Sequence, residues 1–170
     1  DCTNLISIPS IPDTVTDMSG TFSGCTNLRV GQIGYGAVNI SNCFENCTSL
    51  EIAPAILDRV TNMSNTFVNC TKLYEAPNCA SAKNLITIEN AFSGCISMAE
   101  TPFLFKCMYL KNIKNAFRDC VNLTKVLELP KNIDNACGAF YNCKRLVLKP
   151  TLPLNTQVDD ETFFNCGNTY

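Results

Sequence analysis

Apolar positions along the chain follow a helical spacing that recurs in every segment of about two dozen residues. Met18, Thr21, Phe22 and Cys25 lie at positions i, i+3, i+4 and i+7, and the segment from Ile88 to Cys95 repeats this spacing. Such a spacing places side chains on one face of a helix. The pattern therefore predicts a short amphipathic α-helix or 3₁₀ turn in each segment.

Three columns of residues define the repeat. Eight cysteines form a ladder with spacings of 22 to 25 residues, each after the first has a phenylalanine three residues before it, and a leucine or methionine follows three residues after seven of them. Spacings of this size are typical of solenoid proteins. The ladder is Cys2, Cys25, Cys47, Cys70, Cys95, Cys120, Cys143 and Cys166; the aromatic column is Phe22, Phe44, Phe67, Phe92, Phe117, Phe140 and Phe163.

The remainder of each unit contains a turn and a brief extended stretch. Gly, Asn or Asp stands directly before each ladder cysteine after the first, as at Gly24 and Asn69, and these residues tolerate the left-handed conformation that ends a helix. The apolar stretch 50–52 that follows is long enough for a short strand. Proline often closes this stretch, as at Pro54 and Pro77, and would stop it from extending a ladder of backbone hydrogen bonds.

One such unit cannot bury its apolar side alone, whereas a stack of units buries it between neighbours. We therefore expect residues 1–170 to form a single α/β solenoid of about seven units of 22–25 residues. Each unit would combine a short strand with a short helix or 3₁₀ turn. Residues 1–5 resemble the middle of a repeat, so we expect the chain to be a piece of a longer protein.

Two of the repeats carry a recognisable signature. Residues 15–28 read VTDMSGTFSGCTNL and residues 60–73 read VTNMSNTFVNCTKL, with an apolar residue, a small residue before Phe, Gly or Asn before Cys, and then Leu. This signature resembles BspA-type leucine-rich repeats, and the resemblance extends over nearly the whole chain. It implies a leucine-rich-repeat solenoid from a large modular surface or secreted protein of bacteria or some protists, a group implicated in adhesion to host proteins and other cells.

Composition excludes several classes of function. The chain has no histidine, and so it lacks the commonest general base and the commonest zinc ligand. It contains no nucleophile elbow, phosphate-binding loop or dinucleotide fingerprint. We expect neither catalysis nor a cofactor. The net charge of −2 gives no reason to expect nucleic acid, and no apolar run is long enough to insert in a membrane.

The cysteines allow three interpretations: buried thiols, disulfides or metal ligands. Equivalent side chains on adjacent coils would have Cβ atoms about 4.8–5 Å apart, beyond the ~3.8 Å of a disulfide. Metal ligands need closer clustering than the ladder offers, and no CxxC pair occurs. We expect the ladder cysteines to be reduced core residues and no metal to be bound. Cys79, Cys107 and Cys137 lie off the ladder, and a Cys79–Cys107 bridge stays open.

Candidate binding residues follow the ladder cysteines by four or five positions. They would lie on the strand-side surface and could contact a protein or glycan partner, although ordinary solvated strand positions would explain them too. A second candidate is the apolar stretch 103–105 with Tyr109, which would be an interface if exposed and core covering if buried. The strand-side residues are Arg29, Glu51, Glu75, Glu100 and Lys125.

Charge is distributed unevenly along the chain. Residues 106–149 carry nine basic and three acidic side chains, a net charge of +6 within an otherwise acidic protein. Such a segment could meet an acidic partner or a polyanionic glycan, or its lysines could be solvated surface residues.

The resemblance to BspA-type repeats implies an extracellular or cell-surface recognition or adhesion module. It would bind a host protein, another cell or a glycan through the solenoid surface. The alternatives are a structural spacer that projects another domain and an intracellular interaction scaffold.

Overall fold

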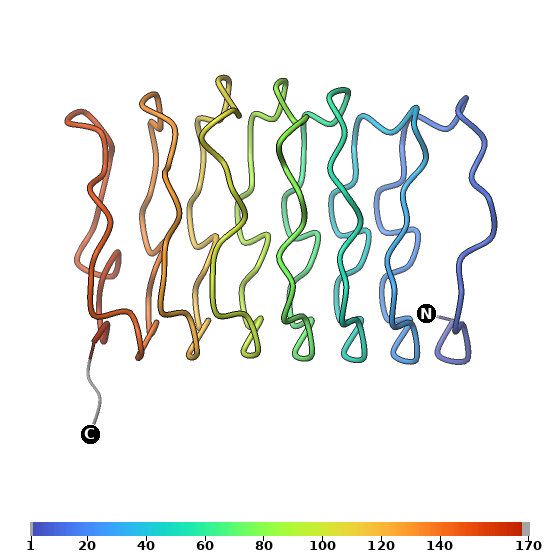
Figure 1. Ribbon diagram of the computed structural model, residues 1–170, viewed down its shortest axis with the longest axis horizontal. Coiled ribbons are helices and arrows are strands. Elements are labelled where there is room, and N and C mark those ends of the chain that lie inside the picture. Colours follow the sequence, from blue (N-terminus) through green and yellow to red (C-terminus); the bar gives the residue numbers. More distant parts are fainter. Residues whose placement is uncertain (1, 168–170) are drawn as a thin grey trace.

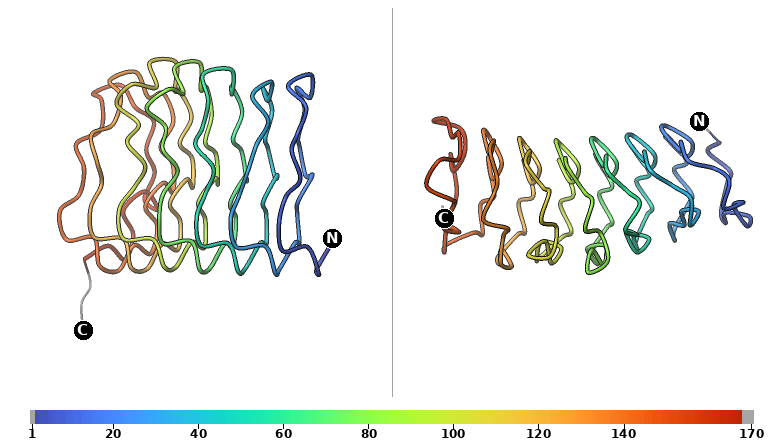
Figure 2. Two further views of the ribbon diagram at one scale, coloured as in Figure 1. Left: turned by 45° about the vertical axis from the view of Figure 1, so that its right-hand side comes forward. Right: turned by 90° about the horizontal axis from the view of Figure 1, so that it is seen from above.

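The computed structural model describes residues 2–167, and these form one solenoid. Its coils lie side by side in a single row, and the row follows a shallow arc when seen from above (Figure 1, Figure 2). One ladder of parallel backbone bridges runs through the row, from Asp17 to Asn39 and on to Gln157. The predicted repeat solenoid is confirmed.

A second set of bridges runs along the segments that follow the ladder cysteines. It joins Val30 to Ile52 and Ile52 to Glu75, and then Glu100 to Lys125. Each bridge involves single residues, and the described residues contain no longer strand and no helix. The expected short strand is therefore reduced to isolated bridges. The predicted helix or 3₁₀ turn is wrong.

A second left-handed residue prevents the helix in six of the units, from the one with Gly20 to the one with Gly138. Gly20 and Gly24 both have positive φ, of 64° and 71°, and Asn42 and Asn46 occupy the same two positions in the next coil with φ of 56° and 59°. The residue before the cysteine was identified from the sequence, but the one four residues earlier was not. Because a left-handed residue in its interior breaks an α-helix, the segment becomes a series of tight turns instead.

Backbone donors in this segment alternate between two kinds of acceptor. The N–H groups of Thr21, Ser23 and Cys25 donate to oxygens three residues earlier in the same coil. Those of Gly20, Phe22 and Gly24 donate to the carbonyls of Ser41, Cys43 and Glu45 in the next coil, at 2.8–2.9 Å. A helix would direct every one of these N–H groups along its own axis. The apolar residues still point inward, as they would in a helix. Their i, i+3, i+4 and i+7 spacing therefore predicted a helix although the segment is a series of turns.

Polar side chains begin each of these segments. Oδ1 of Asp17 accepts the Ser19 N–H at 2.9 Å, and Oδ1 of Asn39 accepts the Ser41 N–H at 3.1 Å. Later coils repeat this local side-chain-to-backbone turn, with Thr87 replacing the Asx residue in one of them. The first position of these segments therefore favours Asp, Asn or Thr, because their short side chains carry an oxygen that can accept the N–H two residues later.

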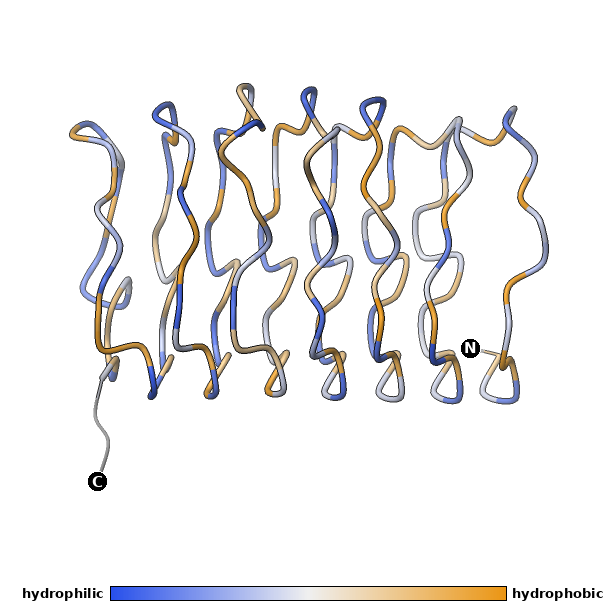
Figure 3. Ribbon diagram, viewed as in Figure 1, coloured by the Kyte–Doolittle hydropathy of each residue, from blue (hydrophilic) through white to orange (hydrophobic). Residues whose placement is uncertain are grey.

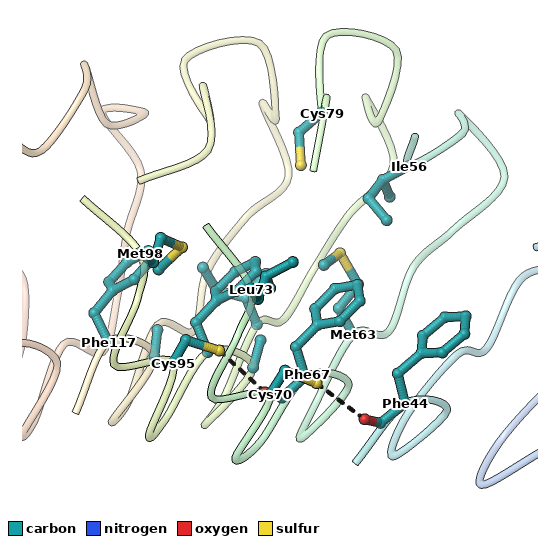
Figure 4. Close-up of a cluster of buried hydrophobic side chains, with 14 of the residues drawn as sticks. Phe44, Ile56, Met63, Phe67, Cys70, Leu73, Cys79, Cys95, Met98 and Phe117 are labelled. Carbon is teal, nitrogen blue, oxygen red and sulfur yellow. Dashed lines mark hydrogen bonds between the residues drawn. The ribbon is translucent and has the colours of Figure 1, made fainter. Parts of the chain in front are cut away.

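The phenylalanine column forms the centre of the core. Neighbouring rings stack with centroids 5.5–5.6 Å apart, from Phe22 through to Phe163. The five rings from Phe44 to Phe140 are fully buried, as Figure 4 illustrates for Phe44, Phe67 and Phe117. The inward orientation predicted for the column is confirmed, and Phe163 is only partly buried because no described coil covers its outer side.

The ladder thiols from Cys47 to Cys166 lie against the same core, and each donates to a backbone carbonyl of the preceding coil. Sγ of Cys70 donates to the Phe44 carbonyl at 3.1 Å, and Sγ of Cys95 donates to the Phe67 carbonyl at 3.1 Å (Figure 4). The contact recurs from Cys47 to Cys166. Alanine would leave the space of Sγ empty and this carbonyl without its second donor. Burial of the ladder thiols is confirmed from Cys25 to Cys143, whereas Cys2 is exposed and Cys166 half-buried.

All twelve cysteines are free thiols in this structure, Cys79 and Cys107 included. Those two side chains are buried, and Sγ of Cys107 lies 3.9 Å from the Cys79 carbonyl oxygen. Burial raises the pKa of Cys43 and of Cys47 to about 12 each, and it also raises the pKa of Cys95 well above its ordinary value. Because the thiolate is the reactive form, these thiols are chemically inert while the fold persists.

Replacement of Gly20 tests the role of the left-handed position. We expect Gly20→Asn to leave the free energy of unfolding nearly unchanged, because Asn42 and Asn65 adopt the same conformation. Gly20→Val should lower it by roughly 1–2 kcal/mol, since a β-branched residue is strained at positive φ. No atom within 4 Å would clash with a Cβ at Gly20, so the difference would report backbone strain. Denaturant unfolding measures both variants, and equal loss in the two would contradict this account.

Thiol labelling tests the core placement of the cysteines. Under native conditions at pH 8, an alkylating reagent should modify the exposed Cys2 first and leave Cys95 and Cys120 unmodified until the chain unfolds. Mass spectrometry of proteolytic peptides locates the label, and Cys2→Ser should leave Cys95 and Cys120 as protected as in the wild-type chain. Labelling of Cys95 as fast as Cys2 would refute the buried ladder.

Candidate functional site

The five predicted strand-side residues are all at the surface, but they occupy two columns. Glu75, Glu100 and Lys125 are themselves bridge residues of the second ladder, whereas Arg29 and Glu51 lie one residue before the bridge residues Val30 and Ile52. The difference arises because Arg29 and Glu51 stand four positions after their cysteine, whereas the other three stand five positions after theirs. The predicted contact row is thus two short rows that are offset by one residue.

Two ion pairs connect these residues between adjacent coils. Arg29 Nη2 lies 2.7 Å from Glu51 Oε1, and Lys125 Nζ lies 3.4 Å from Glu100 Oε1. Pairs as exposed as these contribute little to stability. Their charges are nevertheless largely neutralised within the stack, which leaves Glu75 as the member of the set with no ion pair in the described part of the chain.

The bridge ladder is interrupted beside Glu75. Gly31 N–H donates to the Ile52 carbonyl, and Thr101 N–H donates to the Lys125 carbonyl. Within residues 2–167, however, no backbone hydrogen bond or bridge connects segment 74–78 to segment 99–103. A backbone that is not paired across this gap keeps polar groups available to a partner.

A hollow of about 390 Å³ lies at this interruption. Its walls include Tyr74 and Glu75 from one coil and Glu100, Thr101 and Phe103 from the next. Tyr74 is 56% exposed and Phe103 39% exposed, so two aromatic side chains and two carboxylates border the same depression. The sequence analysis identified the two carboxylates but missed Tyr74. An aromatic residue at a surface position of the repeat could have pointed to it.

The apolar stretch 103–105 is divided between core and surface. Leu104 is fully buried, whereas Phe103 and Phe105 are each about two-fifths exposed, with ring centroids 6.2 Å apart. Tyr109 is more exposed still, at 61%. Leu104 therefore belongs to the core, whereas the two phenylalanines are available to an interface. Phe103 lines the hollow beside Glu75, and Phe105 lines a different hollow.

The basic segment is partly neutralised by neighbouring coils. Lys111 pairs with Asp134 at 3.2 Å, Lys114 with Glu89 at 3.8 Å, and Arg118 with Glu161 at 2.8 Å. Arg118 also lies over the Tyr141 ring, 3.8 Å from its centroid. The segment is therefore no continuous basic stripe. Its remaining cations are found mainly in surface turns.

The acidic run 159–161 has structural partners. Burial is the largest single effect on the pKa of Asp159 and raises it, but the hydrogen bonds that this carboxyl accepts together lower the pKa below its ordinary value. Its Oδ1 accepts hydrogen bonds from the Gly138 N–H and the Thr162 hydroxyl, both at 2.9 Å. Glu161 binds Arg118. No group of three or more His, Cys, Asp or Glu side chains within residues 2–167 is arranged to hold a metal ion.

Solved structures of other leucine-rich repeat proteins share this fold. Two solved leucine-rich repeat proteins match most of this chain, one from Eubacterium ventriosum (19% identity, 95% of this chain and 46% of that chain, TM-score 0.58) and one from Bacteroides ovatus (20% identity, 94% and 52%, TM-score 0.62). The chain spans about half the length of these structures. At such identities the likeness is one of fold alone. No curated protein matches the sequence significantly.

The family model for the BspA type leucine rich repeat region matches residues 1–124 and 64–170, with six copies, and so covers the whole chain. The columns on which the sequence-based resemblance rested are those that form the buried core. The chain belongs to the family of BspA-type leucine-rich repeat proteins.

Proposed function

We propose that this chain is a cell-surface recognition module that binds a protein through its strand-side surface. The repeat family is generally a non-enzymatic interaction module, and its surface or secreted members support this location. No helix within residues 2–167 is long and apolar enough to cross a membrane. A solenoid of this kind offers an extended surface instead of a single deep pocket.

The observation that carries the proposal is the hollow between Tyr74 and Phe103. Partly exposed aromatic side chains beside unpaired backbone groups and carboxylates combine the features of an interface centre: apolar area, hydrogen-bonding capacity and charge. Glu75 has no ion pair to lose when a partner binds. A basic or hydroxyl-rich partner segment would fit this hollow best.

A binding screen tests the proposal. The chain would be applied to a panel of purified extracellular-matrix proteins and glycans, and we expect saturable binding to at least one protein. Glu75→Lys with Glu100→Lys should weaken that binding by about tenfold or more, since two favourable charge contacts become repulsive. Surface plasmon resonance measures the affinities.

The matched control changes two acidic residues outside the hollow, Asp13→Lys with Asp160→Lys, which alters the net charge equally. Both control positions are exposed. If the control variant loses as much affinity as the test variant, net charge and not the hollow determines binding. Absence of saturable binding to every member of the panel would refute the proposal and favour a structural spacer.

A further inference from the structure

A larger hollow lies at a different edge of the solenoid, away from the strand-side surface. Its volume is about 710 Å³, and its lining includes Lys83, Phe105, Met108, Pro130 and Lys131. These residues come from three successive turns, 79–85, 104–110 and 130–133, which belong to the row of turns at the top of Figure 1. We call this row of turns the variable edge. The turns that follow the ladder cysteines form the opposite, cysteine edge.

A cross-turn hydrogen bond that the coils on either side make is absent at the hollow within residues 2–167. Asn84 Nδ2 donates to the Asp58 carbonyl at 2.9 Å, and Asn132 Nδ2 donates to the Met108 carbonyl, so each side chain ties its turn to the one before it. Tyr109 occupies the equivalent position between these two and has no amide to donate. The carbonyl of Lys83, which would be its acceptor, receives no hydrogen bond within residues 2–167.

Apolar side chains cover part of the surface so formed. Phe105 is 40% exposed and Met108 70% exposed, and the buried Pro130 closes one side. In Figure 3 the turn around residue 105 is largely apolar, between turns that are more hydrophilic on either side. Methionine beside an aromatic ring forms an adaptable apolar surface, and the volume lies in the range of ligand-binding hollows.

Three ammonium groups surround this apolar surface without an acidic partner. Lys83, Lys106 and Lys131 form no ion pair within the described residues, in contrast to Lys111, Lys114 and Lys125 of the same region. Because the three like charges border one depression, an anion bound there would relieve their mutual repulsion. The chain as a whole is acidic, so this concentration of positive charge is local.

The depression continues along the variable edge. A neighbouring hollow of about 500 Å³ shares Lys83 and Lys106 and extends past Asp58 to Leu57 and Tyr35. Coils about 4.8 Å apart place the turns at 57 and 131 roughly 15 Å apart, which an extended peptide of about five residues would span. The two hollows together form one open trough along the variable edge, and the carboxylate of Asp58 lies in it. An open trough with one carboxylate suits a peptide better than a nucleic acid backbone or a lipid.

We propose that the variable edge binds an acidic peptide segment with one apolar side chain. Its carboxylates would meet Lys83, Lys106 and Lys131, and its apolar side chain would rest on Phe105 and Met108. The inference rests on the proposed function only in taking a protein as partner, since the residues involved are separate from the hollow at Glu75. One partner could contact both surfaces, or the two could act independently.

Selection from a displayed library of random decapeptides tests this site. The wild-type chain should enrich peptides in which at least two Asp or Glu residues flank an aliphatic or aromatic residue. Lys83→Glu with Lys106→Glu and Lys131→Glu should enrich none of them, and a selected peptide should bind this variant about tenfold more weakly or worse. The matched control, Lys72→Glu with Lys144→Glu and Arg145→Glu, makes the same charge change at the cysteine edge and should retain binding.

A second variant tests the hollow itself. Tyr109→Asn should restore the missing tie to the Lys83 carbonyl, keep or raise the unfolding temperature, and still weaken the selected peptide by at least about fivefold because the hollow narrows. Stability and binding would then move in opposite directions, which a misfolded variant could not produce.

Four outcomes would overturn the inference. They are the absence of acidic peptides from the selection, unchanged binding by the triple lysine variant, equal binding of a peptide whose apolar residue is replaced by serine, and full competition by a sulfated glycan. If Glu75→Lys with Glu100→Lys removed peptide binding while the lysine variant kept it, the peptide would belong to the strand-side surface. That result would refute this inference and leave the proposed function standing.

Discussion

The alternation of backbone donors between the coil and its neighbour is the interaction on which the rest of the structure depends. Half of the N–H groups in each segment of the Met18–Cys25 type hold the turn, and the other half connect it to the next coil. Only residues that tolerate positive φ at two positions per unit permit this arrangement. The coil spacing that results allows the phenyl rings to stack at 5.5–5.6 Å and each thiol to reach the carbonyl of the preceding coil.

The sequence predicted those parts of the fold that depend on burial, and it failed where hydrogen-bond partners decide. The Phe and Cys columns face inward in any structure that stacks the units, so their period was sufficient to predict the core. The turn segment was interpreted as helical because Met18, Phe22 and Cys25 would lie on one face in either conformation. The recurring Gly or Asn at positions 20, 42, 65 and 90 was the signal against a helix, since left-handed residues so placed cannot belong to one.

The candidate sites were predictable in the same uneven way. Glu75 and Glu100 could be assigned to the strand-side surface from their distance to the cysteines. The interruption between their segments depends on which backbone groups pair, and the sequence carries no simple sign of it. At the variable edge Tyr109 stands between two coils in which Asn84 and Asn132 tie their turns, and this difference could be recognised only once those two hydrogen bonds were seen. Both proposed surfaces thus lie where a contact that neighbouring coils make is absent from residues 2–167.

The direction of the bonds between coils has a mechanical consequence. The bridges and the alternate N–H groups join each coil to the next along the row, so tension applied between the two ends of the solenoid acts on every interface between coils at once. The interface with the fewest bonds yields first. Under traction the stack would lengthen by peeling coils from an end, and both surfaces in its middle would keep their shape until the interfaces beside them gave way.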